Sequence, residues 1–271
     1  GLQRVGDLVW ASGDMRARGF LMGGTAGRTT LNGEGLQHED GHSQILSSVV
    51  PNCISYDPTF SYEVAVIIHD GLRRMYVEQE DVYYYITLLN ENYMHPDMPE
   101  GAAPDILKGM HRIGDTASLA ALAASVREGE APPKKAVAGG AKAPRVQLLG
   151  SGSILRQVIA ATELLAHDWG VQADVWSCPS FTELARDGYA VTRWNLLHPT
   201  EAPRKSHVET CLADTKGPVI AATDYMRMFA EQIRPLVGRR YAVLGTDGFG
   251  RSDTREKLRG FFEVNAQYVT V

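Results

Sequence analysis

The sequence has few cysteines and no long apolar run, and both absences narrow the class of protein. Cys53, Cys178 and Cys211 are widely spaced and odd in number. They predict neither a disulfide framework nor a paired-cysteine metal site, and they fit a reducing cytoplasm. No apolar stretch approaches the roughly 18 residues of a membrane span, and no secretory signal pattern opens the chain. We therefore expect a cytoplasmic protein that does not associate with a membrane.

Charge of one sign is also not concentrated anywhere in the chain. The 27 Lys and Arg residues nearly balance 32 Asp and Glu residues, for a net charge of −5, and no long basic block occurs. We expect no nucleic-acid partner, because that binding requires clustered positive charge. The chain of 271 residues is long enough for one large domain or two ordinary ones. It begins mid-pattern and without Met, so we expect a piece of a longer chain.

Alternating apolar patterns predict an α/β fold with mostly parallel sheets covered by helices. The ranges expected as strands are 19–25, 52–56, 81–89, 146–149, 173–177, 219–223 and 241–244. The ranges expected as helices are 2–17, 43–49, 62–77, 155–168, 226–237, a helix from Thr182 to Arg186 and one that begins at Thr254. This order gives two α/β units joined near residue 98.

Three stretches lack the pattern of a regular core element. Residues 90–105 are rich in Pro, Asn, Met and Glu, which predicts a connection between the two units. Residues 116–126 are rich in Ala and could form a short exposed helix. Residues 129–144 combine Pro, Gly and Lys with little apolar bulk, which is typical of a surface loop. We therefore expect a mobile loop near 116–144 within the second unit.

The densest polar chemistry lies in residues 32–42, which end in His38-Glu39-Asp40-Gly41-His42. Two histidines four apart with a glutamate between them match the pattern of a zinc peptidase, which needs a helix so that both imidazoles face one metal. The glycines of this segment and its Asp-Gly pair favour a turn instead. A turn would present a histidine to a cleft, where imidazole is suited to proton transfer near neutral pH. An ordinary exposed polar loop is the third interpretation.

The wider sequence favours the second interpretation, because long strings of it resemble one enzyme family. These strings are Phe20–His42, Pro51–Pro58, Tyr83–Thr87, Leu148–Arg156, Ser180–Gly188 and Gly245–Asp253. Together they resemble, in one order over nearly the whole chain, the homodimeric decarboxylating component of the bacterial pyruvate dehydrogenase complex, a transketolase-like thiamin diphosphate family. The Ala-, Pro- and Lys-rich stretch near 116–144 is the clearest departure and resembles an enlarged surface loop.

The resemblance implies an architecture and a catalytic residue. Residues 1–97 would be the carboxy-terminal part of the pyrimidine-binding domain, and residues 98–271 the carboxy-terminal domain of a three-domain chain. His38 falls on the active-site histidine of the family, which implies that it hydrogen-bonds substrate or intermediate oxygens and takes part in acetyl transfer. Glu39, Asp40 and His42 would support its loop.

The resemblance also implies cofactors and partners. The full-length enzyme would use thiamin diphosphate and magnesium, decarboxylate pyruvate, and pass the acetyl group to the lipoamide of a lipoyl-bearing acyltransferase component. It would act as a homodimer. The main cofactor-binding residues of the family lie upstream of Gly1, so we assign none here and expect this piece alone to be inactive. A non-catalytic dimerisation or assembly module is therefore an alternative.

Smaller signals are interpreted as structural. Gly150–Ser153 lacks the Lys of a P-loop and the third Gly of a dinucleotide fingerprint, so it predicts a tight turn. Gly245–Gly248 predicts a loop between a strand and a helix. Tyr83, Tyr84 and Tyr85 would alternate between the two faces of a strand, which places some of them in the core. The other six histidines are scattered, and we expect surface or satisfied core positions for them.

Overall fold

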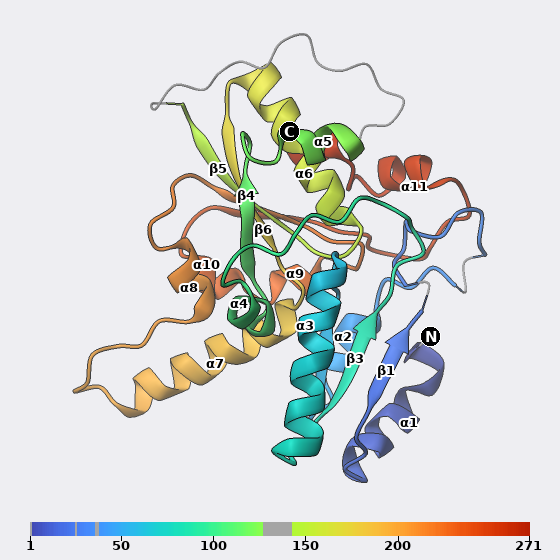
Figure 1. Cartoon of the computed structure of the whole chain (residues 1–271), viewed down its shortest axis with the longest axis vertical. Helices are drawn as coiled ribbons and strands as arrows, with labels where there is room; N and C mark the ends of the chain where they lie inside the picture. The colour runs from blue at the N-terminus through green and yellow to red at the C-terminus, as the bar shows by residue number, and fades with distance from the viewer. Residues whose placement is uncertain (1, 25, 36–37, 127–142) are drawn as a thin grey trace.

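Two sheets organise the chain, for which the computed structural model describes residues 2–24, 26–35, 38–126 and 143–271 (Figure 1). The first sheet has three strands in the order β1-β3-β2, and all of its pairings are parallel. The second has five strands in the order β4-β6-β5-β7-β8, in which β4 runs antiparallel to β6 and the other pairings are parallel. The predicted α/β class with mostly parallel sheets is confirmed.

The first sheet is built from the amino-terminal third of the chain. Its elements are α1 (Leu2–Asp14), β1 (Phe20–Gly23), α2 (Ser43–Ser48), β2 (Cys53–Tyr56), α3 (Ser61–Leu72), the π-helical turn η1 (Arg73–Val77) and β3 (Tyr83–Thr87). Helix α3 packs on one face, where Ile54, Ile67 and Tyr84 share a buried cluster. Helix α1 packs on the other face, where Val9 meets Tyr83 and Tyr85. The three tyrosines thus alternate between faces as predicted, and all three are buried.

The second sheet follows after an irregular connection. Its elements are α4 (Ala103–Lys108), β4 (His111–Asp115), α5 (Ala120–Val126), β5 (Arg145–Gly150), α6 (Ile154–Trp169), β6 (Gln172–Ser177), α7 (Phe181–Leu197), α8 (His207–Leu212), β7 (Val219–Ala222), α9 (Met228–Glu231), α10 (Arg234–Val237), β8 (Tyr241–Leu244), α11 (Arg255–Phe261) and α12 (Ala266–Thr270). Helices α5, α6 and α12 share one apolar cluster, and α7 to α10 share the other. Apolar strands covered on both faces are the usual state of a parallel sheet.

Several predicted bounds were wrong in this part. The helix predicted to end near Arg186 continues to Leu197, because its later turns keep a helical pattern while most of their side chains stay exposed. The single helix predicted at 226–237 is two short helices, with Pro235 at the start of the second. Sequence patterns did not reveal β4, whose burial is uneven along the strand. They also missed α4, α8 and α12, each too short for a clear helical period.

The stretch near 116–144 is only partly described. Residues 120–126 form α5, which packs on α6 with Ala123 buried, so this portion is ordered helix rather than loop. Residues 127–142, where most of the predicted mobile loop falls, lie outside the described residues. The division of the chain at residue 97 stays a prediction.

Buried polar contacts tie the two sheets together. Glu63 at the start of α3 accepts hydrogen bonds from the backbone N–H of Thr59 and Phe60 through Oε2. Its Oε1 lies 2.8 Å from Nε2 of His111 on β4 and accepts a hydrogen bond from Ser177 on β6. The His111 and Glu63 side chains are 1% and 0% exposed. Because isolated charges are costly to bury, this closed cluster fixes how α3 sits on the second sheet.

Within the described ranges, no helix is both long enough and apolar enough to cross a membrane. Cys53, Cys178 and Cys211 are all free thiols, in keeping with the prediction of no disulfide framework.

Candidate active site

The loop between β1 and α2 carries the predicted site and lies against the carboxyl ends of strands from both sheets. The backbone N–H of Ala26 donates to Leu88 after β3, and the N–H of Arg28 donates to Asp224 after β7. Further along, the N–H of Gly33 donates to the carbonyl of Asp253 before α11. Ligand sites of open parallel sheets form at the carboxyl ends of strands, so the loop occupies the expected position for a site.

A cavity of about 570 Å³ opens beside this loop. Its lining includes all four residues singled out from the sequence, namely His38, Glu39, Asp40 and His42. The remaining lining residues are Gln3, Arg4, Gly23, Gly24, Ala26, Arg28, Leu46, Tyr85, Phe249 and Gly250. A cavity of this volume is within the range of small-molecule sites. The structure therefore brings the four predicted residues to one cavity, although their roles stay predictions.

His38 stands at the mouth of the cavity. Its Nδ1 lies 3.0 Å from Oε2 of Glu34, and the two side chains are 61% and 48% exposed. The backbone N–H of His38 donates to the carbonyl of Gly35, which closes a short turn. A carboxylate on Nδ1 favours the tautomer that carries a proton there, and it leaves Nε2 for another partner. The imidazole is thus oriented by its own loop and accessible to a ligand.

Glu39 turns in the opposite direction and is buried, with 4% exposure. Its Oε2 accepts a hydrogen bond from the backbone N–H of Arg251, while its Oε1 has no hydrogen-bond partner among the residues that the structure describes. Burial raises the pKa of Glu39, although the Arg251 hydrogen bond and the charge of Arg28 act in the other direction. Gly250 allows this approach, since a Cβ there would stand 2.5 Å from Oε2 of Glu39. Glu39 therefore anchors the loop to the segment before α11.

Asp40 organises the start of α2. Its Oδ1 accepts hydrogen bonds from the backbone N–H groups of His42 and Ser43, both at 3.0 Å. It also accepts one from Nε2 of Gln3 in α1 at 3.2 Å. Aspartate commonly turns the backbone in this way ahead of a helix. Asp40 thus fixes the backbone of the loop ahead of α2, and its role in a reaction stays a prediction.

His42 is half-buried and contacts Arg28. Nη2 of Arg28 donates to Nδ1 of His42 at 3.0 Å, and Nη1 donates to the carbonyl of Gly248. Burial lowers the pKa of His42, and the positive charge of Arg28 lowers it further. Since guanidinium is always a donor, Nδ1 of His42 must accept and Nε2 must carry the proton. His42 is therefore held as a neutral donor at the cavity wall.

Residues 38–42 form no helix, which removes the geometric basis of the zinc-peptidase interpretation. The two imidazoles are engaged with different partners, Glu34 and Arg28. The zincin pattern needs both on one helical face, with the glutamate between them free to act on water. Here Glu39 is buried away from that position.

Sequence reasoning did not single out Glu34 or Arg28. Glu34 stands four residues before His38, a spacing that could have suggested a pair if the segment had been expected to turn tightly. Arg28 is 1% exposed. Burial lowers the pKa of Arg28, and the charges of Asp224, Asp40, Glu39 and Asp247 oppose that shift only in part. The sequence did hold a signal for Arg28 as a charge partner. Three acidic residues stand at 34, 39 and 40, and Arg28 is the one Lys or Arg between residues 20 and 42.

Two buried aspartates lie near the loop, and one of them, Asp224, is hydrogen-bonded to it. Asp224 accepts hydrogen bonds from the backbone N–H and hydroxyl of Thr29 and from the hydroxyl of Thr30. Asp57 accepts from the hydroxyls of Thr87 and Ser151 at 2.7 and 2.8 Å. Burial raises the pKa of both carboxyl groups, that of Asp57 to about 7, while these hydrogen bonds oppose the shift. Asp224 thus anchors the loop, while Asp57 links the ends of β3 and β5.

The two glycine-containing loops make internal hydrogen bonds, and their structural role stays a prediction. In Gly150–Ser153 the hydroxyl of Ser151 donates to Asp57, and that of Ser153 lies 2.8 Å from the hydroxyl of Thr30. In Gly245–Gly248 the carboxylate of Asp247 accepts from the backbone and side chain of Arg227.

The fold and the position of the site define a transketolase-like α/β protein. A transketolase structure from Campylobacter jejuni superposes on 99% of this chain and 33% of its own, with a TM-score of 0.66 at 14% identity. A transketolase from Leishmania mexicana gives a TM-score of 0.62 at 13% identity, over 97% of this chain and 31% of its own. At such low identity these likenesses establish the fold alone.

Sequence comparison narrows the class further. Residues 1–96 match the family "Pyruvate dehydrogenase E1 component middle domain", and residues 135–265 match "Transketolase-like TK C-terminal domain". The chain is 64% identical over all 271 residues to the pyruvate dehydrogenase E1 component of Cupriavidus necator, and 59% identical over 273 aligned positions to that of Escherichia coli. It spans 28% of the length of these relatives. The chain belongs to the pyruvate dehydrogenase E1 family.

Proposed function

We propose that the chain is part of a thiamin diphosphate-dependent pyruvate dehydrogenase. This enzyme decarboxylates pyruvate and transfers the acetyl group to the lipoamide of an acyltransferase component. The observation that carries the proposal is the 64% identity over every residue of the chain to a pyruvate dehydrogenase E1 component. The His38 cavity at the carboxyl ends of the strands supports it.

His38 is the residue to which we assign contact with the reacting molecule. It is exposed at the cavity mouth, and Glu34 holds its Nδ1, so that Nε2 faces outward. An imidazole in this setting can accept or donate a hydrogen bond to a carbonyl or carboxylate oxygen, and it can move a proton at Nε2. The carboxylate of Glu34 stabilises the protonated ring whenever such a transfer occurs.

His42, Glu39 and Asp40 act as positioning residues in this proposal. The neutral His42 offers an N–H at Nε2 without adding a positive charge to the cavity wall. Glu39 and Asp40 fix the backbone on each side of Gly41, through Arg251 and through Ser43 respectively. A rigid loop keeps His38 within reach of its target, which matters because small displacements cost much of the rate.

The proposed cofactors are thiamin diphosphate and magnesium. When bound, the cofactor serves as electron sink for the loss of carbon dioxide. Within the described ranges, no group of three or more His, Cys, Asp or Glu side chains could hold a metal ion. We assign the residues of this chain only the cavity wall around His38. The remainder of a longer chain would hold the cofactor.

The proposed partners follow from the same family. They are a second copy of the full-length chain, pyruvate, and a lipoyl-bearing acyltransferase component. We place the enzyme in the cytoplasm. The balanced charge, with a net of −5, supports the expectation that nucleic acid is not a partner.

To test the proposal, the 271 residues of this chain replace the matching segment in the full-length Cupriavidus necator protein. Acetyl transfer from pyruvate to lipoamide is then measured with thiamin diphosphate and Mg²⁺ present. His38→Gln should lower kcat on the order of 10²-fold, the scale of a group that moves protons or polarises oxygens. His69→Gln, at an exposed position on α3, is the matched control and should leave kcat unchanged. Equal kcat values for the two variants would remove His38 from the reaction.

A non-catalytic assembly module is the alternative for the 271-residue chain on its own. Exposed apolar side chains favour it, because Trp10 of α1, Met15 just after that helix and Met22 of the edge strand β1 are 45%, 73% and 43% exposed. Apolar patches of this kind mark surfaces that meet another protein. We expect the isolated chain to show no pyruvate decarboxylation with the cofactor and Mg²⁺ added. Turnover by it would contradict that expectation.

A further inference from the structure

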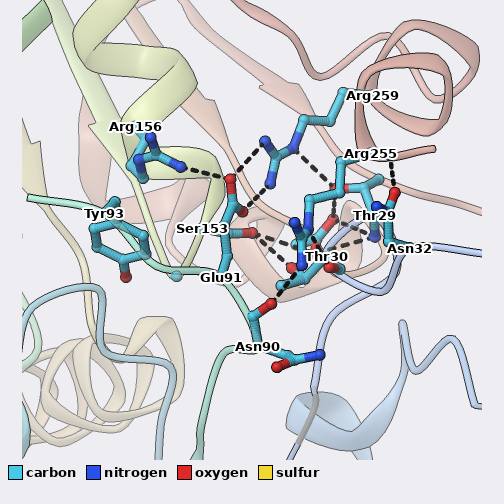
Figure 2. A network of polar contacts seen from close by, with 12 residues as sticks. Thr29, Thr30, Asn32, Asn90, Glu91, Tyr93, Ser153, Arg156, Arg255 and Arg259 are labelled. Atoms are coloured by element: carbon cyan, nitrogen blue, oxygen red, sulfur yellow. Dashed lines mark hydrogen bonds and ion pairs between the residues drawn. The ribbon is translucent and has the colours of Figure 1, made fainter. Parts of the chain in front are cut away.

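A second cavity, of about 510 Å³, lies where the connection after β3 meets α6 and α11. Its lining is almost entirely polar and includes Asn90, Glu91, Asn92, Arg156, Arg255 and Arg259. None of its lining residues lines the His38 cavity. Figure 2 shows Arg156 and Arg259 reaching Glu91 from two sides, with Arg255 beside Thr30 and Asn90. The proposed function uses none of these groups.

The charges at this cavity do not cancel. Among the described lining residues Glu91 is the one carboxylate, against three guanidinium groups, which leaves an excess of two positive charges on them. Glu91 pairs with Nη1 of Arg156 and Nη2 of Arg259, both at 2.5 Å. Burial by itself would raise the pKa of Glu91, but its arginine neighbours outweigh that effect and lower it. The carboxylate is therefore ionised, and its negative charge is already shared between two arginines.

All three arginines are held in place, and two of them, Arg156 and Arg255, keep N–H donors free for a ligand. Arg255 donates from Nε to the carbonyl of Thr30 and from Nη2 to the carbonyl of Asn90, so within the described residues its Nη1 has no protein acceptor. Arg156 stacks on the ring of Tyr93 at 4.6 Å and donates to Glu91 through Nη1 only. Preorganised guanidinium groups whose N–H donors have no protein acceptor match phosphate oxygens in geometry and charge.

From this arrangement we infer that the cavity binds a phosphate ester of a small hydroxylated molecule. A phosphate monoester carries close to two negative charges near neutral pH, which equals the positive excess of the lining. The cavity is larger than a phosphate ion needs, and the amides of Asn90, Asn92 and Gln157 line the rest of it. These amide side chains suit hydroxyl groups, and Val126 is the single apolar side chain among the described lining residues. The inference does not depend on the proposed function.

Isothermal titration of the 271-residue chain with glucose 6-phosphate tests the inference, with inorganic phosphate and glucose as the comparison ligands. We expect glucose 6-phosphate to bind at least tenfold more tightly than inorganic phosphate, and glucose to show no heat. Binding should weaken as salt is raised, because charge drives it. Equal Kd values for glucose 6-phosphate and inorganic phosphate would overturn the ester assignment. The absence of binding for both would overturn the site.

Variants locate the binding. Arg156→Gln removes one guanidinium group that has free donors, while Arg259 still pairs with Glu91. This variant should bind glucose 6-phosphate at least tenfold more weakly. Asn92→Asp places a negative charge at an exposed position of the wall, where folding tolerates it, and should weaken binding several-fold. Arg193→Gln, on an exposed turn of α7, makes the same change in net charge elsewhere and should leave Kd unchanged. A Kd that follows net charge equally in all three variants would contradict a defined site.

Discussion

Arg28, which is buried, and His42, which is half-buried, form a donor and acceptor pair, with Nη2 of Arg28 3.0 Å from Nδ1 of His42. The guanidinium is 1% exposed and also donates to the carbonyl of Gly248. Gly41 makes room for it, since a Cβ at that position would lie 2.1 Å from Nη2. The pair links the start of the loop, its end, and the segment before α11. One cation therefore holds both the shape of the His38 loop and the protonation state of His42.

Arg28→Met should raise the pKa of His42, because it removes a positive charge that opposes protonation while an apolar side chain of similar length stays in place. Burial remains, so the pKa should stay below its ordinary value. Asp224, Asp40 and Glu39 would lose the cation that faces them. The free energy of unfolding should therefore fall by about 3–5 kcal/mol. Nuclear magnetic resonance titration of the His42 ring and denaturant unfolding check the two effects.

Arg28→Lys is the companion variant, because it keeps the positive charge and loses the guanidinium group that donates to both His42 and Gly248. Arg251→Met serves as control because Arg251 is exposed and its charge does not act on His42. An unchanged pKa of His42 in Arg28→Met would mean that burial alone sets it.

Asp57→Asn should flatten the dependence of stability on pH. The pKa of Asp57 is about 7 in the folded chain against 3.8 in the reference state, so the folded state binds the extra proton between these values. Stability contributed by this group is complete below about pH 4 and is lost as pH rises through 7. The size of the shift corresponds to a loss on the order of 4 kcal/mol. Urea unfolding of wild type and variant from pH 4 to 8 measures the difference.

The raised pKa of Asp224 acts in the same direction, so the free energy of unfolding of Asp57→Asn should still fall with rising pH, but less steeply than that of the wild type. Asp14→Asn makes the same chemical change at an exposed position and should keep the wild-type slope. A wild-type chain that gains stability from pH 5 to 8 would show that Asp57 is ionised throughout.

Glu63→Gln should lower the free energy of unfolding by about 1–3 kcal/mol, the cost of leaving buried hydrogen-bond donors unsatisfied. The neutral amide cannot satisfy His111, Ser177 and the two backbone N–H groups of Thr59 and Phe60 together. Glu231→Gln breaks the pair with Arg234, whose side chain is 49% exposed, and should cost at most about 1 kcal/mol. Thermal and urea unfolding compare the two. Similar losses would mean that the Glu63 cluster does not join the sheets.

The sequence was a reliable guide wherever one residue pattern repeated within a single element. Tyr83–Thr87 is rich in β-prone side chains and forms the central strand of its sheet, and the apolar period of α6 gave its bounds to within a residue. The glycine-rich turn at residues 38–42 was also predictable, because Gly41 and Asp40 disfavour a helix there. These features depend on local propensity and periodicity, which are written in consecutive residues.

Pairings between distant residues were decided by the tertiary structure alone. No local pattern places Arg28 against Gly248, Glu63 against His111, or Glu91 between Arg156 and Arg259. The strand β4 became visible only through its antiparallel pairing with β6. Burial and charge pairing depend on what the folded chain brings together, because desolvation and Coulomb energy act through space rather than along the sequence. The chain's residues thus determined its elements, its family and the turn that carries His38. Only the packing of the two sheets decided which charges are buried together and where the two cavities lie.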